Sequence, residues 1–436
     1  MKIAVVGSGI AGLSAAWLLN KNHAVTVYEK NNWVGGHSNT VDAIIGSRPV
    51  AVDTGFIVYN DVNYPNLVAL FDFLDVPSKM SEMSFSASLG KGSFEYSGTD
   101  LNGLFGQRRN IIRPRFWRML WNITQFYNKA PTILANSNEK DLSLGSYLKR
   151  EGYDRRFIED HLLPMGAAIW STTAAEIEAY PAQAFIRFFQ SHGLLSVKNR
   201  PTWRTVDGGS KEYVSRLTKS FRDSIRFTGV ASVTRSHDKI LIHDYSGDTS
   251  SYDHVIFASH ADETLSLLAD ATNNEKRLLG AWRYTKNRAV LHSDPSLMPK
   301  RRRVWSSWNF LNNPTTSSLC VTYWMNRLQS LQTDPQLFVT LNPIREPKVG
   351  TMHREFCYTH PYFDKSALQS QRDLWTLQGV RRSWFCGSYF GYGFHEDALQ
   401  SGLAVAEQLG GLRRPWSVPN ENGRITTLLA KDKIAA

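Results

Sequence analysis

A glycine-rich turn close to the N-terminus constrains the fold of this chain more strongly than any other feature. Gly7-Ser8-Gly9-Ile10-Ala11-Gly12 fits GxGxxG and separates an apolar run at residues 2–6 from an alanine- and leucine-rich run at residues 10–20. These runs predict a buried parallel strand followed by a helix, and residues 24–29, which end in Glu29, predict the next strand of a βαβ unit. The sequence therefore predicts an α/β fold with a Rossmann-type dinucleotide-binding domain.

Each residue type in this turn has a physical role in holding a dinucleotide. Gly7 permits the tight turn, Gly9 lets the backbone approach the diphosphate, and Gly12 lets the helix pack closely on the strand. The helix N-terminus offers free N–H groups and the positive end of the helix dipole to the phosphates. An acidic side chain at the end of the second strand accepts hydrogen bonds from ribose hydroxyls. The expected binding residues of this unit are Gly7, Gly9, Ile10, Ala11, Gly12, Glu29 and Lys30.

The predicted nucleotide-binding domain is discontinuous. Strand and turn patterns typical of it return in residues 203–262 and again in residues 380–412, so these stretches join residues 1–60. Residues 61–202 and 263–379 predict an interleaved, mixed α+β substrate domain. A chain of 436 residues exceeds what one hydrophobic core usually serves, which agrees with two domains. The proline- and asparagine-containing end of the chain, residues 413–436, predicts a weakly ordered tail.

Composition excludes several classes of protein. Hydrophobic residues make up 42% of the chain, and no apolar stretch has the length of a membrane-spanning helix. Cys320, Cys357 and Cys386 form neither a CxxC pair nor a metal-ligand spacing, so no metal is expected. The chain begins directly with a predicted strand, without a signal peptide. We therefore expect a cytoplasmic protein, with peripheral attachment to the inner face of the plasma membrane left open.

Two further glycine motifs indicate whether the dinucleotide is FAD or NAD. Trp33-Val34-Gly35-Gly36-His37-Ser38-Asn39-Thr40 resembles the second glycine motif of the flavin amine oxidase superfamily. Trp384-Phe385-Cys386-Gly387-Ser388 and the stretch from Tyr392 to Gly402 resemble its closing motif, in which a helix N-terminus faces the flavin. The resemblance implies FAD as cofactor and a fold of the amine-oxidase type. This chain departs from the family's usual residues by having His37 instead of Arg, Ser388 instead of Asp or Glu, and Asp397 instead of Gly.

The resemblance also assigns residues to the site. Beyond the first turn, the implied FAD-binding residues are Gly35, Gly36, His37, Ser38, Thr54, Gly55, Phe56, Val230, Gly387, Ser388, His395, Glu396, Asp397 and Ala398. Because the last motif borders the flavin ring, His395 with Glu396 beside it is the candidate catalytic base, and a histidine that only hydrogen-bonds flavin or backbone is the alternative. The candidate substrate pocket consists of Tyr59, Trp324, Tyr389 and Tyr392, whose alternative role is core packing.

Several strings resemble one bacterial group of predicted FAD/NAD-binding oxidoreductases encoded beside cyclopropane fatty acid synthases. They are residues 52–60, 258–263, 298–303, 322–326 and 393–397. The resemblance implies oxidation or desaturation of fatty acyl chains of membrane phospholipids, for example methyl-branched chains, and a pathway partner of the cyclopropane fatty acid synthase type. The alternatives are a flavin amine oxidase acting on a small amine, a reduced-flavin isomerase or carotenoid-type enzyme, and a FAD-containing lipid-pathway partner without turnover.

Positive charge is concentrated in one aromatic segment. The net charge is +11, and between Leu101 and Ala130 there is no Asp or Glu, whereas arginines alternate with Trp, Phe and Tyr. From Pro114 onward this pattern is typical of an interfacial helix on anionic lipid, so residues 105–130 are expected to contact a membrane surface. The alternative is a helix that packs on the core and keeps a solvated basic face. Nucleic acid is not expected because no reading module is recognisable, and the oligomeric state stays open.

Overall fold

The nucleotide-binding half is built on a parallel sheet. The computed structural model describes residues 1–135, 142–196, 200–312 and 320–427. Its five-stranded sheet has the order β10-β2-β1-β14-β20, and every neighbouring pair is parallel. The α/β class and the Rossmann-type domain are thereby confirmed. The strands are β1 (Lys2–Val6), β2 (Ala24–Tyr28), β10 (Ile225–Arg226), β14 (His254–Phe257) and β20 (Ser383–Phe385).

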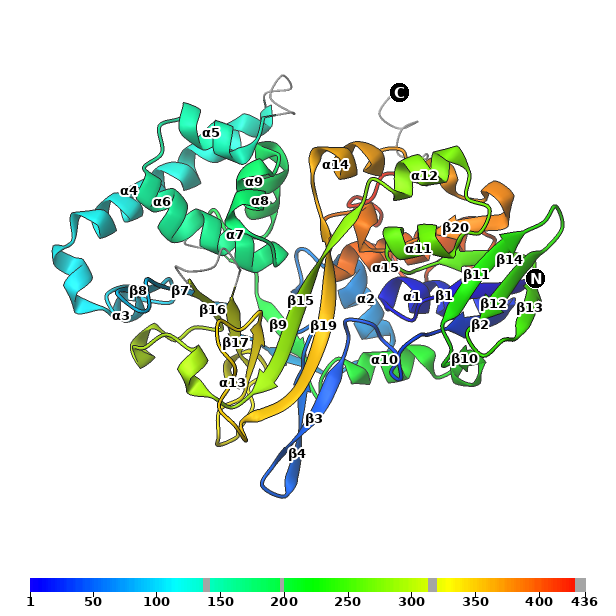
Figure 1. Cartoon of the computed structure of the whole chain (residues 1–436), viewed down its shortest axis with the longest axis horizontal. Helices are drawn as coiled ribbons and strands as arrows, with labels where there is room; N and C mark the ends of the chain where they lie inside the picture. The colour runs from blue at the N-terminus through cyan, green and yellow to red at the C-terminus, as the bar shows by residue number, and fades with distance from the viewer. Residues whose placement is uncertain (136–141, 197–199, 313–319, 428–436) are drawn as a thin grey trace.

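Two helices from opposite ends of the chain pack against each other beside this sheet (Figure 1). They are α1 (Ile10–Leu19), in which every residue is buried, and α15 (His395–Gln408). A Cβ added at Gly402 of α15 would lie 2.2 Å from the carbonyl oxygen of Ala11, so the helices touch backbone to backbone. This contact fixes the N-terminus of α15 relative to the glycine turn before α1. Helix α10 (Lys211–Thr218) also packs on α1, and a small antiparallel sheet, β11 (Val230–Arg235), β12 (Ile240–Asp244) and β13 (Thr249–Tyr252), lies at the edge.

A second, mixed sheet forms the other half. Its seven strands have the order β19-β15-β18-β17-β16-β7-β8, and all fall in the two stretches assigned to the substrate domain. The long strands β15 and β19 run between the two halves in Figure 1, so they are the substrate-domain strands nearest to the nucleotide-binding sheet. The strands are β7 (Phe85–Leu89), β8 (Phe94–Ser97), β15 (Arg283–His292), β16 (Trp308–Leu311), β17 (Val321–Trp324), β18 (Phe338–Leu341) and β19 (Met352–Tyr362).

Helices cover one end of the second sheet. Among them is α4 (Pro114–Lys129), the helix expected from Pro114 onward, whereas α2 (Pro65–Phe73) packs on α15. Across residues 1–135, 142–196, 200–312 and 320–427, no helix combines the length and the hydropathy needed to cross a bilayer. The helical layer also contains α3 (Leu101–Leu104), α5 (Leu144–Arg150), α6 (Arg155–Phe157), α7 (Leu163–Trp170), α8 (Ala174–Ala179) and α9 (Ala182–Ser191).

Shorter elements connect the halves. The hairpin of β3 (Thr40–Ile45) and β4 (Arg48–Asp53) projects from the molecule in Figure 1. A three-stranded sheet joins β5 (Tyr59–Asn60), β9 (Trp203–Val206) and β6 (Ser78–Met80). The remaining helices are α11 (Ala261–Leu267), α12 (Asn273–Leu279), α13 (Met325–Leu328) and α14 (Lys365–Gln371). The exact domain boundaries stay a prediction.

The C-terminal segment differs from its prediction as a weakly ordered tail. Residues 413–427 lie against the nucleotide-binding half, where Arg414 is 2% exposed and Trp416 stacks on Trp17 at 6.0 Å between ring centroids. Arg414 donates to Glu407 of α15 and to the amide oxygen of Asn66 in α2. The physical reason is that buried polar groups on α2 and α15 need partners, which this segment supplies. Residues 428–436 lie outside the described part of the chain.

Candidate nucleotide-binding and active site

Two glycines of the first turn are required by the protein's own packing. Gly7 has φ +106°, and a Cβ there would lie 2.9 Å from the carbonyl oxygen of Ala258, which follows β14. A Cβ at Gly12 would lie 2.0 Å from the carbonyl oxygen of Gly7. Both distances are too short for a side chain, so the turn and α1 take this conformation only with glycine at these positions.

Gly9 is different, because a Cβ added there meets no described atom within 4 Å. It is the N-cap of α1 and has extended backbone, so the free space lies at the N-terminus of that helix. The second glycine turn faces it: Gly35 N–H donates to the Ser8 carbonyl oxygen at 3.0 Å, and a Cβ on Gly36 would lie 3.1 Å from Gly9 Cα. Two glycine turns therefore border one open space at a helix N-terminus, which suits a diphosphate.

Glu29 holds the end of β2 to the same turn. Its carboxylate accepts hydrogen bonds from Ser8 N and Oγ at 3.1 and 2.5 Å, and from Asn31 N and Nδ2 at 2.8 Å each. The residue is buried, at 4% exposure. A carboxylate at this place accepts ribose hydroxyls and disfavours a 2′-phosphate. Lys30, which was predicted with it, forms an ion pair with Glu263 at 2.5 Å on the surface.

Histidines meet where the second glycine turn contacts β15 and β19. The His37 ring lies 5.3 Å from the His360 ring and 5.0 Å from the Tyr358 ring, and His360 Nδ1 lies 3.1 Å from the Asn287 amide nitrogen. Burial, together with the neighbouring histidines, lowers the pKa of His37 well below its usual value. Its Nε2 is buried with no partner among the described residues. The neutral imidazole of His37 thus stands where the flavin amine oxidase superfamily usually has arginine. One of its ring nitrogens is left for a ligand.

The segment predicted at residues 54–56 lies directly beside His37. A Cβ on Gly55 would lie 2.3 Å from the His37 carbonyl oxygen, to which Phe56 N–H donates at 2.7 Å. Thr54 Oγ1 lies 2.7 Å from the Tyr358 hydroxyl. The Phe56 ring stacks on the His395 ring, with centroids 3.9 Å apart. The structure therefore brings together predicted residues from three distant segments.

His395 is fixed by neutral partners at the N-terminus of α15. Its Nε2 lies 2.7 Å from the Tyr213 hydroxyl and 3.3 Å from Ser38 Oγ, and Tyr213 and Ser38 are hydrogen-bonded to each other. Burial lowers the pKa of His395 to about 3. The same burial that keeps this imidazole neutral weakens it as a proton acceptor. Its geometry fits a residue that positions a ligand beside the helix end, and its catalytic role stays a prediction.

Glu396 and Asp397 point into the protein, in contrast to the predicted His395–Glu396 pair. Glu396 is fully buried and accepts from Asn66 N and Nδ2 at 3.1 and 2.9 Å, from Leu67 N at 3.0 Å and from Gln400 at 2.9 Å. These bonds cap the start of α2, so they occupy the carboxylate. Asp397 accepts from Phe394 N at 2.7 Å. In the structure both side chains join α15 to its surroundings, and their predicted roles in catalysis and cofactor binding stay predictions.

The remaining predicted cofactor residues lie around the same sheet edge. Val230 begins β11 and is buried, and the preceding Gly229 packs against the Lys30 side chain. Gly387 N–H donates to Ser401 Oγ of α15 at 2.9 Å. Ser388 starts the short turn that leads to Gly393, and Ala398 lies in the first turns of α15 at 8% exposure. These positions agree with a site that runs along the carboxyl ends of the strands.

The four predicted pocket residues pack against different aromatic neighbours. Tyr59 and Tyr389 are buried, the first against Phe71 and the second against Trp282. Trp324 packs on Trp305 in the second sheet. Tyr392 lies shortly before the N-terminus of α15 and next to Phe188. The contacts of the other three are those of core packing, and their role in a substrate pocket stays a prediction.

An aromatic group that the sequence did not reveal lies beside Tyr392 instead. Phe188 of α9 stacks on Phe394 at 5.0 Å and on His192 at 3.9 Å, and lies 6.4 Å from Tyr392. Phe188 and His192 are buried, whereas Phe394 and Tyr392 are half-buried. The spacing of four residues on one helix face was the only signal for Phe188 and His192, and it is common in cores.

Comparisons of sequence support the nucleotide-binding half. The family profile described as an NAD(P)-binding Rossmann-like domain matches residues 5–74. A 4,4'-diapophytoene desaturase (4,4'-diaponeurosporene-forming) of Staphylococcus aureus strain MRSA252 is 55% identical over a match covering 35% of this chain and 36% of that protein. The same desaturase of strain Newman is 55% identical over 40 residues, 9% of this chain and 8% of that protein. The chain thus matches about a third or less of the length of these curated relatives.

Comparisons of structure cover nearly the whole chain. Putrescine oxidase bound to putrescine superposes with a TM-score of 0.66 at 15% identity, over 94% of this chain and 99% of that one. The chain shares the fold of this oxidase. A putative protoporphyrinogen oxidase from Exiguobacterium sp. 255-15 gives a TM-score of 0.65 at 13% identity, over 94% and 98%. The CLA-producing fatty acid isomerase from P. acnes gives 0.64 at 14% identity, over 93% and 97%. The predicted amine-oxidase-type fold is therefore confirmed.

Proposed function

We propose that this chain is a FAD-dependent oxidoreductase that oxidises or desaturates the acyl chains of membrane lipids. One observation carries the cofactor assignment: the space beside Gly9, bordered by Gly36 and open to the N-terminus of α1. Glu29 at the ribose position and the unpartnered Nε2 of His37 fit the two ends of such a ligand. Diapophytoene desaturase and fatty acid isomerase among the similar proteins support a flavin and an apolar substrate.

The surface next to His395 favours an uncharged, apolar substrate over an amine. Phe56, Phe394 and Tyr392 are half-buried there, and the histidines are neutral because burial lowers their pKa values. A protonated amine needs a carboxylate partner, but Glu396 and Asp397 are turned inward and hydrogen-bonded. In the described part of the chain no lysine is hydrogen-bonded to the histidine cluster, and Lys286, beside Asn287, is exposed.

Oxidation of an acyl chain removes two hydrogens from neighbouring carbons. When bound, FAD supplies the acceptor for a hydride from one C–H bond, and O₂ or another acceptor restores the oxidised cofactor. The second hydrogen leaves as a proton, and a double bond forms between the two carbons. In this chain the aromatic side chains exclude water and hold the apolar chain, while Tyr213 and Ser38 keep His395 against the reacting region. A pathway partner of the cyclopropane fatty acid synthase type stays a prediction.

Anaerobic mixing of the purified protein with candidate substrates tests this function. We expect a bacterial phospholipid extract rich in methyl-branched chains to bleach the flavin absorbance, and small amines such as putrescine to leave it unchanged. Bleaching by amines alone would replace the proposal with an amine oxidase. A double bond that moves without net flavin reduction would indicate an isomerase, and the absence of any change would indicate a pathway partner without turnover.

A further inference from the structure

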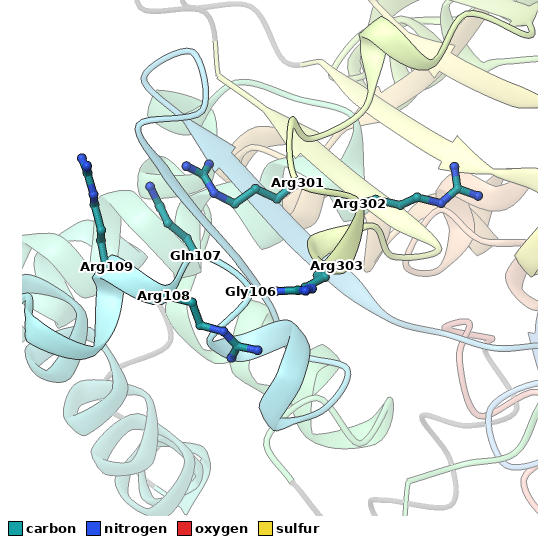
Figure 2. A pocket seen from close by; sticks show the side chains of 7 residues that line it. All are labelled: Gly106, Gln107, Arg108, Arg109, Arg301, Arg302 and Arg303. Atoms are coloured by element: carbon teal, nitrogen blue, oxygen red, sulfur yellow. The ribbon is translucent and has the colours of Figure 1, made fainter.

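Two basic segments that are far apart in the sequence form one arginine-lined hollow. It has a volume of about 510 Å³ and lies where the short helix η1 (Arg108–Ile112) approaches the short helix η7 (Arg302–Val304). Gly106 packs against Val304, which joins the segments. Figure 2 shows the side chains that line the hollow, and its charged members are Arg108, Arg109, Arg301, Arg302 and Arg303. The hollow contains no residue of the predicted cofactor site.

Most of this positive charge is not neutralised within the protein. Arg301 forms an ion pair with the buried carboxylate of Glu95 at 2.7 Å. Arg108, Arg109, Arg302 and Arg303 have no carboxylate partner among the described residues, and all four are exposed. Arg302 instead lies over the Trp305 ring at 4.8 Å. By contrast, Arg115 and Arg118 of α4 pair with Asp160 and Asp154. Four arginines without a carboxylate partner in the described part of the chain therefore lie at the hollow.

Large apolar side chains are exposed on the elements next to the hollow. Ile112 is 81% exposed, and Trp117 and Trp121, one turn apart on α4, are 49% and 66% exposed. Trp117 is held in place by a hydrogen bond from its Nε1 to the Ile111 carbonyl oxygen at 2.8 Å and by the Phe105 ring at 5.9 Å. The opposite face of α4 packs into the core through Phe116, Met119 and Phe126. Helix α4 thus has a buried face and an apolar exposed face at once.

We propose that this surface binds the phosphodiester head groups of anionic phospholipids and inserts its tryptophan and isoleucine side chains at the membrane interface. In Figure 2 the guanidinium groups point to different sides: Arg109 extends toward the top of the view, Arg301 to the left and Arg302 to the right. Such a spread suits several head groups in a plane better than one enclosed phosphate. Tryptophan at the boundary and arginine at the phosphates is the composition that interfacial helices use. A nucleic acid offers no partner for the exposed Ile112.

The inference deepens the proposed function, on which it rests for the choice of a lipid partner. A lipid-oxidising enzyme must reach acyl chains that remain in a bilayer, and a docking surface beside its substrate half provides that access. Binding to vesicles needs neither flavin nor turnover. A failure of the redox proposal and a failure of membrane docking are therefore distinguishable by separate measurements.

Sedimentation of the full-length protein with vesicles tests the docking surface. We expect binding to vesicles of phosphatidylcholine with phosphatidylglycerol, little binding to phosphatidylcholine alone, and weakening at high salt. Changing Arg108, Arg109, Arg302 and Arg303 together to Gln should reduce partitioning at least about tenfold, since each basic residue near the surface adds to it. The matched control removes four exposed positive charges elsewhere and should bind as the natural protein does: Arg48→Gln, Lys219→Gln, Arg222→Gln and Arg354→Gln.

Two further measurements keep the inference falsifiable. The pair Ile112→Ser and Trp121→Ser changes exposed residues only, and it should weaken vesicle binding and reduce the blue shift of tryptophan fluorescence on binding, with Trp117 left in place. Equal loss in the arginine variant and its control would show a general charge effect and overturn the site. Competition by inorganic phosphate at constant ionic strength, or tighter binding to RNA than to vesicles, would replace the membrane with a soluble anion or a nucleic acid.

Discussion

Arg424, close to the C-terminus, forms a two-point ion pair with Asp397 in the first turn of α15, with nitrogen to oxygen distances of 2.6 and 3.1 Å. Asp397 is fully buried, and Arg424 also donates to the Asn63 carbonyl oxygen at 2.8 Å. Burial raises the pKa of the Asp397 carboxyl, and the guanidinium opposes this rise. Asp397, at a position where the flavin amine oxidase superfamily usually has glycine, therefore carries a negative charge. Arg424 in the C-terminal segment neutralises this charge.

Arg424→Gln should destabilise the fold by about 3–5 kcal/mol, because it leaves a buried carboxylate without its counter-charge. Adding Asp397→Asn should recover much of this loss, since the double variant buries no net charge. Free energies of unfolding from urea titrations measure both effects. The control is Arg413→Gln, which removes a half-exposed pair with Glu407 and Glu421 and should cost less than about 1 kcal/mol. Additive losses in the double variant would contradict the pairing.

Gly9→Val and Gly12→Val should fail in different ways. A Cβ at position 9 meets no described atom within 4 Å, so the protein with valine there should fold but lose its flavin, because the side chain fills the diphosphate space. Valine at position 12 would collide with the Gly7 carbonyl oxygen and should reduce the yield of folded protein. Circular dichroism and visible absorbance separate the two outcomes. A folded Gly9→Val protein with full flavin absorbance would place the cofactor elsewhere.

Glu396→Gln should lower stability and leave the chemistry intact. The amide cannot accept all four hydrogen bonds that the carboxylate accepts, and the loss should be about 1–3 kcal/mol. His395→Gln should instead slow flavin reduction more than it lowers stability, because the His395 ring contacts Phe56, Tyr213 and Ser38 at the predicted site. Stopped-flow reduction per bound flavin distinguishes them. A Glu396→Gln protein that keeps its stability and loses reduction would restore the predicted catalytic pair.

Stability should fall as the pH drops from about 6.5 toward 4. Burial lowers the folded-state pKa of His161 and His292 to about 4 and of His192 to about 3. Below the unfolded value the unfolded chain binds protons that the folded chain does not, so each histidine costs about 2 kcal/mol at pH 5. Asp53 acts in the opposite sense, because burial raises its pKa to about 6.

Thermal unfolding between pH 5 and pH 8 measures this dependence. His292 accepts from Asp294 N at 3.1 Å and is paired with Thr340 Oγ1 at 2.7 Å, a set of partners that the neutral ring satisfies. His292→Gln should therefore flatten the curve, whereas His237→Gln, at a histidine that is almost fully exposed, should leave it unchanged. Identical pH curves for the natural protein and His292→Gln would show that its protonation does not limit stability.

The nucleotide-binding half was predictable because its signals are local. The motif from Gly7 to Gly12, the flanking strands and Glu29 fix a βαβ unit whose geometry leaves few alternatives. Gly35 and Gly55 were also predicted: glycine is required at Gly35 by its φ of +119° and the nearby Ser38 carbonyl oxygen, and at Gly55 by the His37 carbonyl oxygen. These glycines are needed for their backbone conformation and backbone contacts, and positions of this kind are recognisable from sequence motifs.

Side-chain partners over long sequence distances were not predictable. Glu396 was predicted to take part in catalysis because it follows His395. Its carboxylate instead accepts hydrogen bonds from Asn66, some 330 residues away. The partner of Asp397, Arg424, lies in a segment whose composition predicts weak order. The role of an aromatic residue is hard to predict for the same reason. Tyr59 and Tyr389 are residue types that often line pockets, yet both are buried like core residues.

The cofactor content of the purified chain tests the central claim most directly. The protein should be yellow, and heat denaturation should release FAD at close to one molecule per chain, in accord with the glycine space beside Gly9 and the carboxylate of Glu29. A folded protein that neither contains flavin nor binds added FAD, or that binds a nicotinamide dinucleotide in its place, would contradict the account.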